Sequence, residues 1–183
     1  MCEGCYSELI DNARMKYAAF LRGVSPMNCR MPALKQALEK AGFKNVKTLL
    51  SSGNATFDSR STSIPALEKK IEAALGKELG TAFMTFVRPI RELQQMIASD
   101  PYKGTKLPAD AKRIVTFLRA VPLGVKLPIE KDGARLLHFE GQTLFGAYER
   151  SDKGPVFMVL IEKTVGKEQT TRTWQTVERV AKA

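Results

Sequence analysis

The sequence is poor in the residues on which most metal and nucleophilic sites depend. Its 183 residues include one histidine, three cysteines and one tryptophan. Three cysteines are too few for a disulfide framework. A structural zinc site needs four ligands, which one histidine beside a single C-x-x-C pair does not supply. No apolar run approaches the ~18–20 residues of a membrane-spanning helix. The composition therefore indicates a globular chain with no membrane partner, no metal site and no cofactor motif.

Cys2 and Cys5 form the C-x-x-C pair in a polar N-terminal stretch. A redox C-x-x-C normally lies between a strand and a helix, so this pair has little support as a redox site. Free cysteines without a secretory signal predict a cytoplasmic setting. Residues 1–14 carry a net charge of −2 and are expected to form an N-terminal extension, either disordered or an upstream start. The folded part would then begin at Met15.

Positive charge is the strongest compositional feature. The chain has 29 lysines and arginines against 19 acidic residues, a formal net charge of +10. Residues 15–95 carry +7 and residues 96–183 carry +5, so the excess is spread over both halves. A basic surface attracts nucleic acid, phosphorylated metabolites or anionic lipid. The alternative is a basic surface that has no specific partner.

The first half has the pattern strand, helix, strand, strand, helix, strand. The strands are expected at residues 17–21, 46–50, 55–57 and 83–87, and the helices at 32–41 and 64–75. This order is typical of the ferredoxin-like split β-α-β fold.

The second half repeats this pattern less regularly. It predicts a helix at 89–98, a strand at 114–118, a hairpin of 134–139 with 143–148, and a final helix from Trp174. Residues 156–165 are interpreted as a helix, although their β-branched residues favour a strand. We therefore predict an α+β protein of two consecutive ferredoxin-like domains with antiparallel sheets, residues 15–95 and 96–183.

A split β-α-β topology brings the ends of its first two strands to the same edge of the sheet, because the crossover makes them parallel. The residues expected at this edge are the cations Arg22 and Arg30, the hydroxyls of Ser25, Ser51 and Ser52, and the amides of Asn28 and Asn54. With the start of the first helix, such a set suits a phosphate or a carboxylate. Alternatively, Gly53 and Asn54 only build a turn and Asn28 only satisfies the loop backbone.

The run from Thr170 to Trp174 is the other notable segment. It is expected to place hydroxyls, Arg172 and the only tryptophan, Trp174, at the start of the final helix. This would be an anion- or aromatic-binding corner, or alternatively an N-cap with a core anchor.

Catalytic motifs are absent from the sequence. A strand histidine such as His138 is more simply explained by a satisfied side chain than by a catalytic base. The sequence has no G-x-S-x-G elbow, P-loop or G-x-G-x-x-G, so catalytic residues and enzymatic activity stay open. Phe20 and Phe57 lie where an RNA-binding sheet has aromatic residues, but the corresponding sequence pattern is missing.

Several short segments, in order and spacing, resemble the bacterial domain-of-unknown-function 1697 family. They are A-F-L-R-G at 19–23, S-P-M-N at 25–28, A-G-F-K-N-V-K-T at 41–48, S-S-G-N at 51–54 and T-T-R-T-W-Q-T-V at 170–177. The resemblance covers nearly all of residues 15–183. It implies two consecutive ferredoxin-like α/β domains and no established activity.

Two loops depart from the pattern of this family. Many relatives have a glycine-rich loop after the first strand, where this chain has S-P-M-N-C-R. Residues 150–155 read R-S-D-K-G-P in place of a G-R-S-K-L-type stretch. Ligands that those loops carry in relatives are therefore not transferred to this chain.

Three hypotheses about function remain. The first is a binding module for nucleic acid or another polyanion. The second is a small-molecule site, with or without catalysis, for a phosphorylated or carboxylated metabolite at the edge formed by Arg22, Asn28, Ser52 and Asn54. The third is a structural or interaction protein without a ligand. The sequence does not predict an oligomeric state.

Overall fold

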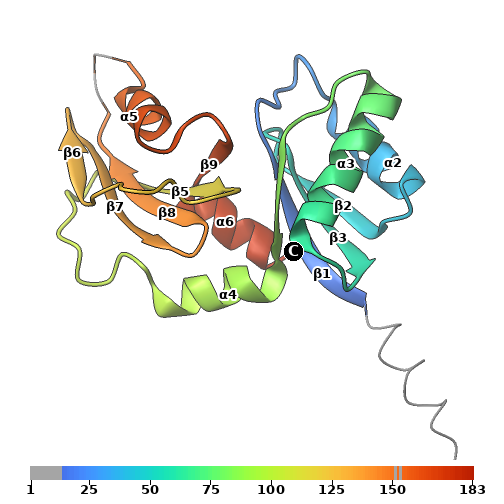
Figure 1. Cartoon of the computed structure of the whole chain (residues 1–183), viewed down its shortest axis with the longest axis horizontal. Helices are drawn as coiled ribbons and strands as arrows, with labels where there is room; N and C mark the ends of the chain where they lie inside the picture. The colour runs from blue at the N-terminus through green and yellow to red at the C-terminus, as the bar shows by residue number, and fades with distance from the viewer. Residues whose placement is uncertain (1–13, 151, 153) are drawn as a thin grey trace, which may run out of the picture. The chain divides into compact units, whose positions relative to one another are not determined.

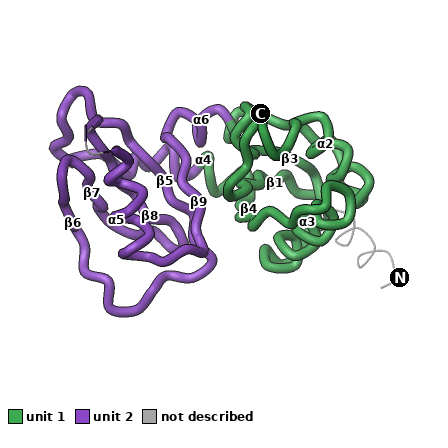
Figure 2. Tube along the Cα trace, turned by 90° about the horizontal axis from the view of Figure 1, so that it is seen from above, with its two compact units in different colours: residues 1–94, 180–183 green, residues 95–179 purple. Residues whose placement is uncertain are grey.

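The computed structural model describes residues 14–150, 152 and 154–183 (Figure 1). Residues 1–13 of the expected N-terminal extension, with Cys2 and Cys5, lie outside the described residues. Arg14, which was assigned to the extension, is the first residue of a strand, one residue before the expected start at Met15. Within them the chain is an α+β protein with two antiparallel sheets and five helices. It divides into two compact units, residues 1–94 with 180–183 (unit 1) and residues 95–179 (unit 2) (Figure 2). The last four residues thus belong with the first half of the chain.

Unit 1 follows the strand and helix order expected from the sequence. Its elements are β1 (Arg14–Leu21), α2 (Met31–Lys40), β2 (Lys44–Leu49), β3 (Asn54–Arg60), α3 (Ile64–Leu79) and β4 (Thr85–Pro89). The strands form a sheet in the order β2-β3-β1-β4, and all neighbours are antiparallel. Pro32 and Pro65 each stand in the first turn of their helix, where no backbone N–H is needed.

The side chains of β1 divide between the two faces of this sheet, because successive side chains of a strand point to opposite sides. Tyr17, Ala19 and Leu21 belong to the apolar core that includes residues of α2 and α3. Ala18 and Phe20 point to the opposite face and are also fully buried. One face of the sheet is therefore covered by α2 and α3, and the middle of the opposite face, around Ala18 and Phe20, is buried as well.

Helix α3 also caps the open edge of the sheet at β4. The Oε1 atom of Glu68 accepts a hydrogen bond of 2.9 Å from the backbone N–H of Val87. Glu72, one turn later, accepts one of 2.8 Å from Thr85. Burial lowers the pKa of Arg88. The Glu68 carboxylate lies 4.0 Å from Nη1 of Arg88, and its negative charge acts to raise the same pKa. The two carboxylates satisfy N–H groups that would otherwise invite pairing with another strand.

Unit 2 contains the second sheet, in the order β6-β7-β8-β5-β9, again with antiparallel neighbours. Its strands are β5 (Lys112–Leu118), β6 (Ile129–Lys131), β7 (Ala134–Glu140), β8 (Thr143–Tyr148) and β9 (Gln169–Thr173). Helix α5 (Val156–Val165) packs on the core of Ile114, Leu118, Leu136 and Leu144. Helix α4 (Ile90–Ser99) begins in unit 1, and α6 (Trp174–Ala181) ends there.

The structure adds two strands that the sequence analysis did not predict, β6 and β9. It confirms the helix at 156–165 and the start of the last helix at Trp174. It corrects the prediction that Thr170–Arg172 lie at the start of that helix, because these residues belong to β9. Thr173 directly precedes the helix, and its Oγ1 accepts a hydrogen bond of 3.4 Å from the backbone N–H of Thr176, as expected of an N-cap. No described helix lies between β5 and β7, where the chain contains Pro122, Gly124 and Pro128.

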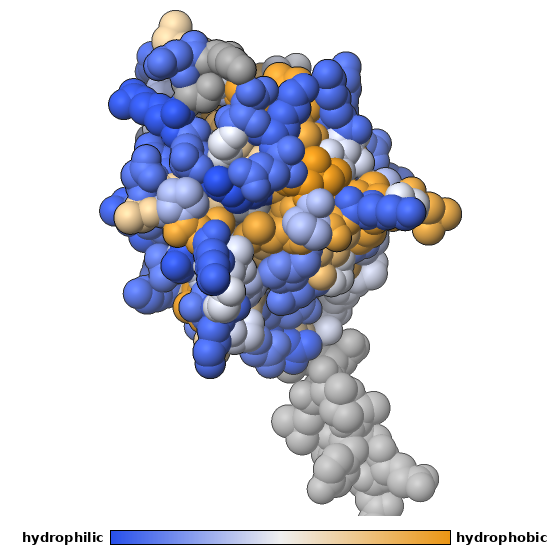
Figure 3. All heavy atoms as spheres, turned by 90° about the vertical axis from the view of Figure 1, so that its left-hand side faces the viewer, coloured by the Kyte–Doolittle hydropathy of each residue, from blue (hydrophilic) through white to orange (hydrophobic). Residues whose placement is uncertain are grey.

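Among the described residues, no helix combines the length and the apolar character that crossing a membrane requires. Hydrophilic residues cover most of the face drawn in Figure 3. Apolar side chains still reach the surface of unit 2. Met158 and Val159 of α5 are 55% and 52% exposed.

We expect Glu68→Ala to lower the free energy of unfolding by ~2–4 kcal/mol, because it removes a charge-assisted hydrogen bond and leaves Val87 N–H buried without that acceptor. Glu39→Ala is the matched control. Glu39 is exposed on α2 and lies 3.8 Å from Lys35, so its loss should cost less than ~0.5 kcal/mol. Urea unfolding measures both. Equal losses in the two variants would show that capping of β4 does not stabilise unit 1.

Candidate functional site

The structure brings together the loop after β1 and the turn after β2, as the topology predicts. The backbone N–H of Leu21 donates to the carbonyl oxygen of Gly53 at 2.8 Å. Gly53 has a φ of +72°, and a Cβ there would lie 2.7 Å from the Cβ of Val24. Residues about thirty positions apart therefore lie in direct contact at this edge of unit 1.

Within this edge, the amide side chains of Asn28 and Asn54 hold the loops. Asn28 Nδ2 donates to Gly23 at 2.8 Å, and its Oδ1 accepts from the backbone of Ser25 at 2.8 Å. Asn54 is fully buried, and its Nδ2 donates to Leu49 O and Ser52 Oγ, each at 3.1 Å. These contacts match the alternative in which both amides organise the backbone.

The cations and hydroxyls predicted at this edge differ in their exposure. Arg22 is half-buried, and its backbone N–H donates to Met84 at 2.8 Å. Arg30 is exposed and immediately precedes α2, whose start has no side-chain cap. Ser51 and Ser52 are exposed in the turn. Close by in the loop, Cys29 is buried, and burial raises the pKa of its thiol.

The other two predicted site residues lie in unit 2. Arg172 is on β9, and its Nη1 donates to Thr170 Oγ1 at 2.7 Å and to Thr171 O at 2.9 Å. Burial lowers the pKa of Arg172 to about 10. Trp174 is 9% exposed and packs edge-on against Tyr102, with ring centroids 5.2 Å apart. Trp174 therefore serves as a core anchor with one small exposed area.

A group of cations that the sequence analysis did not single out lies on the face of the first sheet opposite α2 and α3. We call this group the basic sheet face. It consists of Arg14, Lys16, Lys44, Lys47 and Arg60. The assignment follows from the register, because residues directly opposite each other on neighbouring strands share a face. The paired positions are Arg14 with Arg60, Lys16 with Asp58, Lys44 with Asp58, Lys47 with Thr56 and Thr56 with Ala18.

Two lysines of the basic sheet face already hold one oxygen atom. Lys16 Nζ donates to the main-chain oxygen of Ala183 at 2.6 Å, and Lys47 Nζ donates to the same oxygen at 3.2 Å. Gln94 supports the same segment through a 3.2 Å hydrogen bond to Ala181 O. The buried Thr56 hydroxyl has no hydrogen-bond partner in the described part of the chain. The face thus has the geometry to bind an oxygen acceptor between two ammonium groups.

The single carboxylate at the paired positions of this face is Asp58, which accepts a hydrogen bond of 2.6 Å from Asn45 Nδ2. Five cations against one carboxylate give a strongly positive surface. The signal for it is present in the sequence. Arg14 and Lys16 alternate with Met15 and Tyr17, which belong to or pack against the helix-covered core, and this alternation has the period of a strand.

Residues 14–150, 152 and 154–183 contain no cluster of three histidine, cysteine or acidic side chains that could hold a metal ion. His138 Nε2 lies 3.4 Å from Glu140 Oε1, and its ring packs against Phe145 at 5.2 Å. His138 thus has the neighbouring partner that the sequence analysis favoured over a catalytic role.

Comparisons with known proteins agree with this fold. A family model described as "Protein of unknown function (DUF1697)" matches residues 15–134. Among solved structures, the chain is similar to the conserved bacterial protein SP0830 from Streptococcus pneumoniae, with a TM-score of 0.69 and 18% identity. The match covers 93% of this chain and 98% of that one. At this identity the likeness shows the fold alone. No curated protein matches the chain.

We expect Gly53→Ala to destabilise the protein more than Gly23→Ala. Both glycines have left-handed φ angles, +72° and +73°, which cost alanine ~1–2 kcal/mol. Only at Gly53 does the added Cβ collide with Val24, which adds ~1–3 kcal/mol of overpacking. The free energies of unfolding in urea measure the difference. If the two variants unfold alike, the close approach of Gly53 to Val24 does not restrict the side chain at position 53.

Proposed function

The chain belongs to the DUF1697 family of proteins of unknown function, and from that premise we propose that it binds polyanions, nucleic acid above all, through the basic sheet face. The observation that carries the proposal is the alignment of five cations by strand register on one side of β1, β2 and β3. Lysine and arginine side chains in such a row neutralise phosphates and release their condensed counterions.

Unit 1 concentrates the charge. Residues 14–94 with 180–183 contain 15 basic and 6 acidic side chains, a net of +9, whereas residues 95–179 contain 14 and 10, a net of +4. The two units therefore differ in potential, and a polyanion is attracted mainly to unit 1.

The aromatic residues considered for base stacking do not support sequence-specific reading. Phe20 and Phe57 are both fully buried. A surface that has cations but no exposed aromatic side chain binds the phosphate backbone. Contacts of this kind carry no direct sequence information. The proposal is therefore for salt-sensitive binding with little sequence preference.

A metabolite site at the loop edge has less support. The amides of Asn28 and Asn54 hydrogen-bond to their own loops. A ligand there would have to use Arg22, Arg30 and the serine hydroxyls, or break these contacts.

The finer description of the fold also belongs to this proposal. We interpret both units as ferredoxin-like domains, with the boundary along the chain near residue 95. The order β2-β3-β1-β4 in unit 1 and the order β7-β8-β5-β9 in unit 2 support this interpretation. Unit 2 departs from it by the added strand β6 and by the lack of a helix between β5 and β7. A cytoplasmic location, expected from the free cysteines, is likewise proposed.

Fluorescence anisotropy with labelled DNA and RNA oligonucleotides, titrated across potassium chloride concentrations, tests the function. The variant Arg14→Gln/Lys44→Gln/Arg60→Gln removes three exposed cations from the basic sheet face. We expect it to bind at least ~10-fold more weakly and to flatten the slope of log K against log salt by about 2, since each phosphate contact contributes about 0.7–0.9.

The matched control is Lys35→Gln/Lys69→Gln/Lys77→Gln, which removes the same charge from exposed positions on α2 and α3. This variant should keep most of the affinity. Equal weakening in both triple variants would show that net charge alone attracts the polyanion. No binding at low salt by the unaltered protein would favour the structural or interaction protein without a ligand.

A further inference from the structure

A cavity of about 480 Å³ is lined by residues of unit 2. Apart from Ala111, its lining residues are Lys112, Arg113, Thr173, Trp174, Gln175 and Glu178. This volume is in the usual range for sites that hold a small molecule. The family description names no ligand for it.

Strand pairing explains why these residues meet. β5 and β9 are antiparallel neighbours, with Ile114 opposite Thr173. The start of β5 therefore lies beside the end of β9, and α6 begins at the next residue, Trp174. The sequence analysis expected Arg172 to accompany Trp174 in a binding corner. The cavity instead has Arg113 as its arginine, from a different strand.

An aromatic support fixes the position of that arginine. Tyr102 is buried, and its hydroxyl donates to the carbonyl oxygen of Ile114 at 2.7 Å. The guanidinium carbon of Arg113 lies 5.2 Å from the centre of the Tyr102 ring. Trp174 packs edge-on against the same ring. A cation–π contact holds the guanidinium without using its N–H donors.

Four of the polar side chains that line the cavity have no hydrogen-bonding or ionic partner among the described residues, whereas the Thr173 hydroxyl is paired with Thr176. In the described part of the chain, the side chains of Lys112, Arg113, Gln175 and Glu178 make no hydrogen bond or ion pair, although their backbones belong to β5 and α6. The single contact that the structure records for the Arg113 guanidinium is with the Tyr102 ring. Two cations and one carboxylate thus line one cavity with their hydrogen-bonding capacity unused. Their charges complement a ligand that carries an anion and a cation at separate ends.

We propose that this cavity binds a small zwitterion, whose phosphate or carboxylate contacts Lys112 and Arg113 and whose ammonium group contacts Glu178. The exposed part of Trp174 forms one wall of the site. This activity is separate from polyanion binding, because none of its residues belongs to the basic sheet face.

The protein provides its own reporter for the test, since Trp174 is its only tryptophan. The full chain is titrated with phosphoethanolamine and β-alanine, which pair an ammonium group with a phosphate and a carboxylate respectively, while the intrinsic fluorescence is recorded. Inorganic phosphate and ethanolamine present each charge alone. At least one zwitterion should give a saturable change and bind about tenfold more tightly than either single charge. Isothermal titration calorimetry provides an independent affinity.

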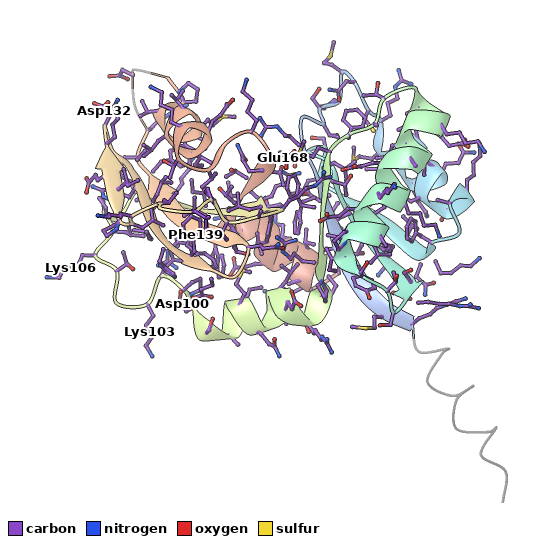
Figure 4. The ribbon with its side chains drawn as sticks, in the orientation of Figure 1. Asp100, Lys103, Lys106, Asp132, Phe139 and Glu168 are labelled. Carbon is purple, nitrogen blue, oxygen red and sulfur yellow. The ribbon has the colours of Figure 1, made fainter. Side chains whose placement is uncertain are left out.

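Arg113→Gln and Glu178→Gln should each weaken zwitterion binding by about tenfold, the loss of one charge-assisted contact. Lys103→Gln and Glu168→Gln are the matched controls, because both residues are exposed and neither lines the cavity. Figure 4 shows that Lys103 extends outward from the loop before β5. Circular dichroism and thermal unfolding confirm that each variant is folded.

Three outcomes would overturn the proposal. The first is the absence of a saturable response to either zwitterion. The second is inorganic phosphate binding as tightly as phosphoethanolamine, which would indicate a general anion patch. The third is unchanged binding in both Arg113→Gln and Glu178→Gln. The Arg14→Gln/Lys44→Gln/Arg60→Gln variant should keep the full fluorescence response, which separates this site from polyanion binding.

Discussion

The central position of β1 is the constraint on which the rest of unit 1 depends. This strand is hydrogen-bonded to β3 on one side and to β4 on the other. A shift by one residue would move Tyr17, Ala19 and Leu21 out of the apolar core. The core therefore locks the register, and the register in turn places Arg14 and Lys16 on the opposite face. The basic sheet face is a consequence of the same alternation that builds the core.

The two edges of this sheet are closed by different means. At β4, the carboxylates of Glu68 and Glu72 accept the outward N–H groups. At β2, the exposed Lys44 and Lys47 flank a register irregularity, and edge lysines and bulges both discourage pairing with another strand. The β2 lysines thus serve two purposes. They keep the edge from pairing with another chain, and they contribute to the surface proposed to bind polyanions.

Most of the fold could be predicted because it depends on local patterns. Apolar spacing, the prolines in the first turns of α2 and α3, and the turn residues between β2 and β3 indicate the elements of unit 1. The strands β6 and β9 could not be found in this way. β6 has three residues, and β9 consists of polar residues that are held by pairing with β5. Tertiary pairing there outweighs the helix-start signal of Thr170–Arg172, whereas Thr173 still caps α6.

The candidate sites were likewise predictable only where they depend on the order of the strands and helices. Topology alone predicted that the loops after β1 and β2 meet, and Leu21 does contact Gly53 there. Which groups remain available for a ligand was not predictable, because it depends on hydrogen bonds such as those of Asn28. That Arg113 and Trp174 line the same cavity was likewise not predictable from the sequence. The pairing of β5 with β9 and the contacts of both residues with the Tyr102 ring bring them together, and their spacing in the sequence does not.

By itself, the sequence determined the family resemblance, the excess of positive charge, and the order of nearly all strands and helices. Each of these is encoded in neighbouring residues or in composition. The tertiary structure alone decided which cations share a face, which amides are already satisfied, and which residues line the cavity of unit 2. These properties depend on strand register and on contacts between distant segments, which no local pattern specifies.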